Sequence, residues 1–452
     1  MKEIRNTKIK GISEVFLIYK LTKQLKGKLK KEPLSTYIIN DGKKEILYIK
    51  VDKDEETIRN AIVKALNWRE KIQVHLSKAI DKKREMYVII ETFELFKFKH
   101  NYKTKKENKK YELYILEKST RKLEEIVREA KIIAQSQNYG RKLVNTPPNI
   151  GTADYIVKEV KKFAKDMGFN CKILDKKMLK KKGFNTFLAV NEASAYGAYL
   201  VKLTYKPKTY KKKIAIVGKG VTFDTGGLGL KPSTYMYSMH LDKSGAIAVL
   251  GIMRAIKLLK LNVMVEGYLA LTDNAIGPKA IQPNAIVKAY NGKTVEILHT
   301  DAEGRLILAD TLAYASEQKY DYIFDLATLT GAMSVSLGKY AIGVFTQNEK
   351  LGELIKKIGL KIGEKAWPFP MWKEYEEMLK SEVADIKNLG SWKGEAGSIT
   401  AAKFLEFFVK DKKKWVHLDI ASMMDTEKHP YFGSGGICPG VRLVVHTIKE
   451  LV

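Results

Sequence analysis

The hydrophobic positions of the first hundred residues form short runs separated by polar segments. Runs that predict strands lie at residues 14–20, 35–40, 45–51 and 85–93, and residues 55–68 have the spacing of an amphipathic helix. Strands that alternate with helical segments in this way are typical of a small α/β domain.

A longer segment with helical periodicity follows this region. Residues 122–143 contain few helix breakers, and paired prolines in the sequence VNTPPNIGT come directly after them. We place the domain boundary at this point. It separates an N-terminal α/β domain with its connecting helix, residues 1–142, from a larger domain, residues 143–452.

Beyond the boundary, hydrophobic runs that predict strands alternate with helical segments. Strands are predicted at residues 213–223, 262–272, 286–298, 320–329, 340–346 and 415–421. Helices are predicted at residues 152–169, capped by Thr152, at residues 244–260 and from Asp301 onward. Strands that are hydrophobic on both faces, with helices between them, predict a central, mostly parallel mixed sheet covered by helices. Ligands of such sheets bind beyond the carboxyl ends of the strands.

The composition is that of a folded soluble protein, with 45% hydrophobic and 29% charged residues. No hydrophobic run approaches the roughly 18 residues of a membrane span, and the N-terminus lacks the pattern of a signal peptide, so we expect no membrane partner. Cys171 and Cys438 are the two cysteines, they lie far apart and no CxxC motif occurs, so neither a disulfide framework nor a zinc site built from cysteines is indicated. These features fit a cytoplasmic location.

The formal net charge of +30 is the abnormal feature of the composition. A surplus of this size would attract nucleic acid or other anionic partners. The lysines, however, are spread along the chain, and no arginine-rich arm or aromatic-interleaved basic motif stands out. A generally solvated lysine surface is therefore the favoured interpretation, and a basic nucleic-acid-binding protein is the alternative function.

The glycine-rich stretch GKGVTFDTGGLGLKP, residues 218–232, follows a predicted buried strand. It is not a phosphate-binding P-loop, because the first required glycine would fall at Lys213. It is not a dinucleotide fingerprint either, because the third glycine would fall at Phe223. What remains is one carboxylate, Asp224, between Lys219 and Lys231 in a backbone that a ligand can approach closely.

The stretch HTDAEGRLILAD, residues 299–310, has two explanations. Thr300 and Glu303 have the spacing of a helix capping box. Alternatively, Asp301 and Glu303 belong to an active site, together with Asp224 and with Asp242, which precedes another predicted helix. The sequence of this stretch alone does not decide between them.

Four carboxylates that converge on one point would repel one another strongly unless cations compensate them. Four carboxylates shared by two ions suit a two-metal site. Oxygen ligands favour Mn²⁺ or Mg²⁺, and one nitrogen donor shifts the preference towards Mn²⁺, Co²⁺ or Zn²⁺. A lysine near two cations can lose its proton and become such a donor, while another stays protonated and polarises a substrate carbonyl. His417 is expected to be a hydrogen-bonded residue of a buried strand instead of a ligand.

Several motifs together match one family. HTDAEGRL, VGKGVTFDTGGLGLKP, LVNTPPN, DLATLTGA, GEAGSITAAKFL and WVHLDIA occur in the family's order between about residues 140 and 447. The sequence resembles the leucyl aminopeptidases, the cytosolic di-metal exopeptidases of the M17 type. The N-terminal part is similar only in size and in its α/β character.

The resemblance implies a metal site for two divalent ions per subunit, Mn²⁺ or Zn²⁺, with Mg²⁺ or Co²⁺ as alternatives. Lys219, Asp224, Asp242 and Glu303 would bind the tightly held ion. Asp224 and Glu303 would bridge to a more exchangeable ion, and Asp301 would complete that second site. On this basis residues 143–452 form the catalytic domain.

The resemblance also implies the reaction and the substrate. A water that bridges the metals attacks the first peptide bond of a short peptide and releases leucine or another apolar N-terminal residue. Lys231 would hold the scissile carbonyl, and Arg305 would hold a bicarbonate ion that acts as general base. The family assembles as a homohexamer, a dimer of trimers. The side-chain pocket for the released residue would consist of Met239, Thr328, Gly331, Ala421 and Met424.

One position departs from the family pattern, because His299 stands where the family usually has asparagine. We expect it to act next to the metal site and not as a ligand. Thr300 is expected to cap the following helix, whereas Asp301 and Glu303 face the metals. A complete capping box is therefore not expected to form.

Overall fold

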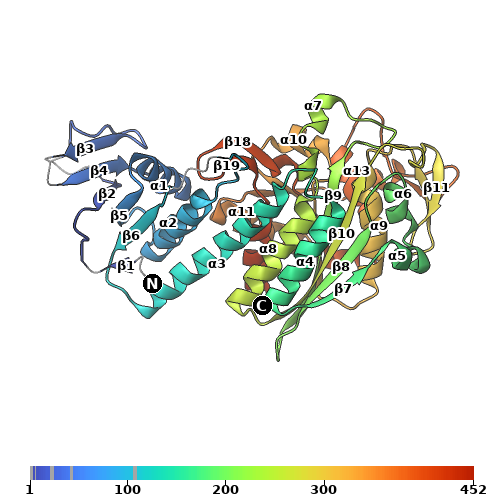
Figure 1. Cartoon of the computed structure of the whole chain (residues 1–452), viewed down its shortest axis with the longest axis horizontal. Helices are drawn as coiled ribbons and strands as arrows, with labels where there is room; N and C mark the ends of the chain where they lie inside the picture. The colour runs from blue at the N-terminus through green and yellow to red at the C-terminus, as the bar shows by residue number, and fades with distance from the viewer. Residues whose placement is uncertain (1–3, 6, 21–24, 41–43, 105–108) are drawn as a thin grey trace. The chain divides into compact units, whose positions relative to one another are not determined.

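A computed structural model describes residues 4–5, 7–20, 25–40, 44–104 and 109–452 (Figure 1). The chain forms two compact units. The first contains Met1–Gln135 and Glu427–Ser434, and the second contains Ser136–Thr426 and Gly435–Val452. None of the described helices is both long and apolar enough to cross a membrane.

The N-terminal unit contains a six-stranded sheet in the order β1-β6-β5-β2-β4-β3. All neighbouring strands are parallel except β3, which pairs antiparallel with β4. The elements are β1 (Ile4–Arg5), β2 (Ser13–Ile18), β3 (Thr36–Asn40), β4 (Glu45–Lys50), α1 (Glu55–Trp68), β5 (Lys71–His75), α2 (Lys82–Lys97) and β6 (Glu112–Leu116). The predicted α/β character of this region and the helix at residues 55–68 are confirmed.

The strand predicted at residues 85–93 is wrong, because these residues lie within the helix α2. Every residue from Glu85 to Phe96 of this helix is buried, so the run has no polar face that would reveal a helical period. The helix begins after Asp81, whose carboxylate accepts hydrogen bonds from the backbone N–H groups of Lys83 and Arg84.

The long helix predicted at residues 122–143 is confirmed as α3 (Arg121–Val144). It ends just before the paired prolines, as expected. The next helix, α4 (Ala153–Met167), has Thr152 as its N-cap, and the Thr152 side chain accepts a hydrogen bond from the backbone N–H of Tyr155. The cap predicted from the sequence is therefore confirmed.

The larger unit is built on an eight-stranded sheet in the order β15-β14-β17-β13-β9-β10-β8-β7. Its central strands β17, β13, β9 and β10 are parallel, whereas β8 and β7 on one side and β14 on the other introduce antiparallel pairs. The strands are β7 (Asn170–Leu174), β8 (Tyr199–Tyr205), β9 (Lys212–Asp224), β10 (Val263–Asn274), β13 (Tyr322–Ala327), β14 (Ile342–Phe345), β15 (Ala366–Phe369) and β17 (Trp415–Asp419). The predicted α/β fold with a mostly parallel mixed sheet is confirmed.

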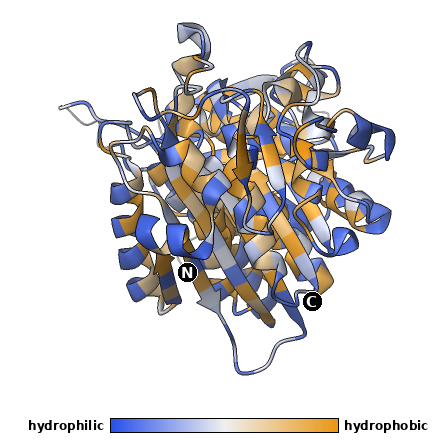
Figure 2. Ribbon diagram, turned by 90° about the vertical axis from the view of Figure 1, so that its right-hand side faces the viewer, coloured by the Kyte–Doolittle hydropathy of each residue, from blue (hydrophilic) through white to orange (hydrophobic). Residues whose placement is uncertain are grey.

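Helices cover both faces of this sheet (Figure 1). One face carries α4, α8 (Ser244–Leu259) and α14 (Val441–Leu451), and the other carries α6 (Asn185–Asn191), α9 (Glu303–Ser316) and α13 (Gly397–Glu406). Because both faces are covered, β10 is buried along its whole length. In Figure 2 the strands between the helices are mainly hydrophobic, whereas the helices also carry hydrophilic residues.

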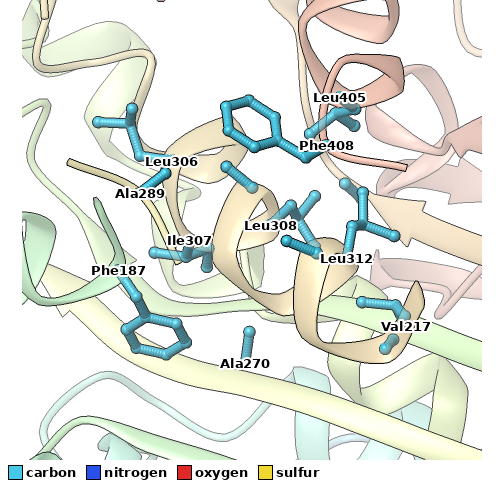
Figure 3. Packing of buried hydrophobic residues seen from close by; sticks show 14 of the residues in the cluster. Phe187, Val217, Ala270, Ala289, Leu306, Ile307, Leu308, Leu312, Leu405 and Phe408 are labelled. Atoms are coloured by element: carbon cyan, nitrogen blue, oxygen red, sulfur yellow. The ribbon is translucent and has the colours of Figure 1, made fainter. Parts of the chain in front are cut away.

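The helix α9 lies deep in the hydrophobic core (Figure 3). Its residues Leu306, Ile307, Leu308 and Leu312 are fully buried. Around them pack side chains from α6, from the sheet and from the chain near α13, among them Phe187, Val217, Ala270, Leu405 and Phe408. A helix that is surrounded in this way has little freedom to move, so its first residue, Glu303, is held in place.

Shorter elements complete the larger unit. The strand predicted at residues 286–298 is a hairpin, β11 (Ala285–Lys288) and β12 (Thr294–Ile297), and β12 also pairs with β16 (Ile386–Lys387). Its remaining elements are α5 (Lys176–Lys182), α7 (Ser233–Met236), η1 (Met239–Leu241), α10 (Gly331–Leu337), α11 (Glu349–Ile362), α12 (Glu374–Glu377), η2 (Lys412–Lys414) and η3 (Ala421–Met423). The strands β18 (Asp425–His429) and β19 (Gly433–Gly436) pair with each other, and most of their hairpin, Glu427–Ser434, belongs to the first unit.

Candidate metal centre and substrate pocket

The carboxyl ends of the central parallel strands hold a cluster of charged side chains. Lys219 lies within β9, and Asp224 is the last residue of that strand. Asp242 lies between η1 and α8. Glu303 begins α9, and Asp301 lies in the turn before it. The fold thus brings together residues that are more than eighty positions apart in the sequence.

Each lysine of the cluster contacts two carboxylates. The Nζ atom of Lys219 lies 2.9 Å from Asp242 Oδ1 and 2.8 Å from Glu303 Oε1. The Nζ atom of Lys231 lies 2.9 Å from Asp224 Oδ2 and 2.5 Å from Asp301 Oδ1. Carboxylate oxygens of Asp224, Asp242 and Glu303 all lie within 4.8 Å of one another. Four carboxylates therefore share a very small space with only two ammonium groups.

Burial makes this concentration of negative charge costly. Burial raises the pKa of the Asp224, Asp242 and Asp301 carboxyls above their ordinary values, although the neighbouring lysines lower it, and repulsion from other carboxylates adds to the rise. The cluster is consequently a place where additional positive charge would be strongly favoured.

The donor set fits divalent cations. Asp242 Oδ2 is buried and has no hydrogen-bond partner among the described residues. Each lysine nitrogen stands between two carboxylates, so these carboxylates are already arranged around positive charge, and together with Asp224 they would hold divalent cations. Although burial by itself lowers it, the pKa of Lys219 is raised by Asp242, Glu303 and Asp224. Lys219 would therefore become a neutral nitrogen ligand only where a cation displaces its proton.

Gly304 allows Lys219 to reach this cluster. A Cβ atom at position 304 would lie 2.5 Å from Cε and 2.7 Å from Nζ of Lys219. Any side chain at this position would thus collide with the lysine as it passes the start of α9. The glycine in the TDAEGRL motif is explained by this close approach.

Thr300 is not the cap of α9, so this prediction is wrong. The N-cap is Ala302, without a side-chain hydrogen bond, and the complete capping box is absent, as expected. Thr300 instead holds the glycine-rich loop, because its hydroxyl donates to Gly226 O and accepts from Gly229 N, both at 2.7 Å. The capping-box spacing does not reveal this tertiary role, since the same hydroxyl can serve either partner.

Thr300→Val is expected to weaken metal binding about tenfold to a hundredfold and to destabilise the fold by about 2 kcal/mol. Valine keeps the shape of the side chain but leaves Gly226 O and Gly229 N without their partner. Mn²⁺ titration and urea denaturation measure the two effects. Thr311→Val is the matched control, because the buried Thr311 hydroxyl donates within α9, to Ile307 O, and touches neither the glycine-rich loop nor the charged cluster among the described residues. Equal metal affinity in both variants would contradict the proposed role of Thr300.

Asn388 forms hydrogen bonds with both Arg305 and His299 and so links these two residues of the site. Arg305 Nη1 donates to Asn388 O at 2.8 Å, and burial lowers the pKa of Arg305 to about 10, so the guanidinium stays charged at neutral pH. The Asn388 side chain donates to His299 O at 2.8 Å. His299 Nδ1 accepts a hydrogen bond from the backbone N–H of Asp301 at 3.1 Å, so His299 orients the turn that carries Asp301.

The charged cluster forms the floor of a pocket of about 740 Å³. All the charged residues singled out in the sequence line this pocket, and so do the five residues expected around the released side chain: Met239, Thr328, Gly331, Ala421 and Met424. The Thr328 hydroxyl also donates to Asp242 Oδ1 at 2.6 Å, and Thr328 O accepts from Lys219 at 2.9 Å. Thr328 thus contacts the charged cluster as well as the pocket.

Asn274 is a site residue that the sequence analysis missed. It ends β10, next to β9 in the sheet, and its side chain donates to Asp224 Oδ1 at 2.8 Å and to Thr300 O at 3.2 Å. A signal was present, because a polar residue at the carboxyl end of a parallel strand adjacent to β9 satisfies the rule that located Asp224.

His417 has the structural role expected from the sequence. It is fully buried in β17, and its Nδ1 atom lies 2.6 Å from Asp325 Oδ1. Burial by itself lowers the pKa of His417, but the Asp325 carboxylate raises it above its ordinary value. The other Asp325 oxygen accepts a hydrogen bond from Trp415 Nε1, so the Asp325 carboxylate links the adjacent strands β13 and β17.

Comparison with known proteins agrees with this geometry. The family model described as "Cytosol aminopeptidase family, catalytic domain" matches residues 138–445. The chain belongs to the cytosol aminopeptidase family. A probable cytosol aminopeptidase of Aquifex aeolicus is 43% identical over 430 residues, which is 92% of this chain and 84% of that protein. A second one, from Persephonella marina, is 44% identical over 73% of this chain and 66% of its own length.

A solved structure extends the similarity to the whole chain. The bottromycin maturation enzyme BotP in complex with Mn has a TM-score of 0.88 and 28% sequence identity, and the match covers 98% of this chain and 100% of BotP. Membership in the cytosol aminopeptidase family makes this protein a metal-dependent aminopeptidase. The family named from the sequence motifs is therefore confirmed.

Proposed function

We propose that the protein removes N-terminal leucine, or another apolar residue, from short peptides with two divalent metal ions. The convergence of Asp224, Asp242 and Glu303 within 4.8 Å, at the floor of a pocket with apolar walls, is the observation that carries this proposal. A water between the two ions would be the attacking group, as the resemblance to leucyl aminopeptidases implies. The ions, when bound, supply Lewis acidity and a nucleophile at neutral pH.

The arrangement of the side chains supports two neighbouring ion positions. Asp242 and Glu303, both paired with Lys219, would hold the first ion together with Asp224. Asp224 and Asp301, both paired with Lys231, would contribute to the second. Mn²⁺ or Zn²⁺ suits this set of carboxylates with one nitrogen donor, and Mg²⁺ or Co²⁺ is an alternative. BotP, the structural relative, was solved in complex with Mn.

Lys231 is placed to bind the carbonyl oxygen of the scissile bond. Although burial by itself lowers it, the pKa of Lys231 is raised by Asp224, Glu303 and Asp301, so the ammonium group stays protonated. A fixed ammonium group stabilises the negative charge that develops on the carbonyl oxygen in the transition state.

Arg305 would hold a bicarbonate ion that accepts a proton from the attacking water. Its guanidinium is buried and lines the pocket, and its Nε atom has no hydrogen-bond partner among the described residues. A buried cation with an unused donor favours an anion at this point.

The pocket for the released side chain favours leucine or methionine. Met239 and Met424 supply flexible apolar surface that adapts to branched or long side chains. Gly331 leaves open space, because a Cβ atom there would contact nothing within 4 Å. We further propose the homohexamer that the resemblance implies, which sedimentation analysis can test.

The proposed function is tested by leucine release from Leu-Gly. With Mn²⁺ the protein is expected to hydrolyse the peptide, and chelation is expected to abolish the activity and to destabilise the fold. Rebinding of Mn²⁺ at about a thousand times its Kd restores about 4 kcal/mol of stability. Hydrolysis that persists after complete removal of metal would refute the proposal, as would release of leucine only from the C-terminus of a peptide.

A further inference from the structure

His299 and Trp392 form an aromatic wall of the active-site pocket, and the proposed function leaves this wall without a role. Both residues line the pocket, with ring centroids 5.7 Å apart and a tilted arrangement. The wall comes from the turn before α9 and from the loop before α13. The five residues proposed around the released side chain come from other parts of the chain: η1, α10, η3 and residues directly next to β13 and η3.

The imidazole of His299 is held in a fixed orientation. Because Nδ1 accepts the hydrogen bond from Asp301 N, the neutral ring carries its proton on Nε2. Gly229 supports the ring closely, since a Cβ atom at position 229 would lie 2.9 Å from His299 Cε1. Asn388 also ties the backbone of His299 to the loop that leads to Trp392. The aromatic wall is thus preorganised.

Trp392 presents a large apolar surface to the space above the site. Its relative exposure is 69%, although it lines a pocket and contacts His299. An exposed indole at the mouth of a binding pocket is suited to stack against a flat or bulky apolar group. Among the described residues the His299 imidazole is the aromatic ring beside the indole, and the 69% exposure of Trp392 leaves most of its surface available to a ligand.

The position of the wall identifies the part of the substrate that would contact it. Asp301, which His299 orients, forms the ion pair with Lys231, the residue proposed to hold the scissile carbonyl. The side chain on the amino side of this carbonyl enters the pocket lined by Met239 and Met424. The residue on the carboxyl side leaves on another side of the pocket, and His299 and Trp392 line the side next to the turn that carries Asp301.

We propose that the aromatic wall binds the side chain of the second substrate residue and makes the enzyme prefer an aromatic residue there. This inference rests on the proposed aminopeptidase function and adds a specificity determinant to it. His299 and Trp392 act by contact with the substrate, and neither takes part in proton transfer.

The test compares hydrolysis of Leu-Phe and Leu-Gly by the full-length, Mn²⁺-loaded protein. In the wild type we expect kcat/KM for Leu-Phe to be about ten times that for Leu-Gly. Trp392→Ala is expected to lower this ratio about fivefold, mainly through a higher KM for Leu-Phe. Trp392→Phe is expected to retain most of the ratio. Trp372→Ala is the matched control, because Trp372 is 63% exposed and lies outside this pocket, against Tyr375.

The outcomes separate the two proposals. A wild-type protein that cleaves neither peptide would overturn the proposed function, because Leu-Gly has no second side chain to place on the wall. Cleavage of both peptides with the same ratio in the wild type and in Trp392→Ala would overturn only the role of the aromatic wall. An equal fall of this ratio in Trp372→Ala would also overturn the role of the aromatic wall, because the loss of preference for Leu-Phe would then not depend on a residue of the pocket.

Discussion

Glu303→Gln is expected to lower the kcat/KM for Leu-Gly by about a thousandfold and to reduce the amount of bound metal. Glu303 is 1% exposed, lies 2.8 Å from Lys219 and shares the cluster with Asp224 and Asp242. Glutamine has nearly the same shape but no charge, so the attraction for a cation falls while the packing of α9 is kept. Steady-state kinetics and metal analysis after gel filtration measure the two effects.

The matched control for Glu303 is at the other end of the same helix. Glu317 is the C-cap of α9, exposed, and accepts a hydrogen bond from the Tyr290 hydroxyl. Glu317→Gln is expected to leave metal content and kcat/KM unchanged within about twofold, since exposed charges contribute little at a distance. If Glu303→Gln retained wild-type metal content and activity, Glu303 would not be a ligand.

Lys231→Met is expected to lower kcat about a hundredfold to a thousandfold while the bound metal stays in place. The side chain is only 14% exposed and pairs with Asp224 and Asp301, so methionine fills the same space without an ammonium group. The loss appears mainly in kcat, because the interaction with the carbonyl oxygen becomes stronger as negative charge develops on it.

Metal analysis distinguishes this variant from Glu303→Gln, in which metal is lost. Lys293→Met is the matched control, because Lys293 lies in the turn of the β11–β12 hairpin, is 53% exposed and pairs with Asp385, which precedes β16. Retention of more than half of the wild-type kcat by Lys231→Met would exclude a role of the ammonium group in transition-state stabilisation.

Local patterns drew attention to the charged residues that the fold brings together, although their proposed roles came from the resemblance to a family and not from the spacing. Asp224 stands in a glycine-rich loop after a buried strand, and Asp301 and Glu303 stand at the start of a helix. Asn388 could not be singled out in the same way, because it is a solitary asparagine in a loop, whereas Asn274 carried the signal of a polar residue at a strand end and was missed. Their roles arise from contacts with Asp224, His299 and Arg305, which only the tertiary structure defines.

Part of the fold could be predicted because buried strands and amphipathic helices have different periods. The hydrophobic pattern gave a wrong prediction for α2, because burial on all sides hides its helical period. It also missed strands at one side of the larger sheet. β7 and β8 carry partly exposed residues, including Lys172 and Lys202, so neither has the continuous hydrophobic run that marked the central strands. Thr300 shows a third limit, since local spacing cannot state which distant backbone group a hydroxyl will bind.

The burial of α9 in the core limits which parts of the site can change during evolution. Glu303 stands on a helix enclosed by packed side chains, so the spacing between its carboxylate and those of Asp224 and Asp242 is difficult to change without rebuilding the interior. Trp392, by contrast, stands in an exposed loop and is itself 69% exposed. If the aromatic wall binds the second substrate residue as proposed, single substitutions at the rim would change peptide preference while the charged cluster stays as it is.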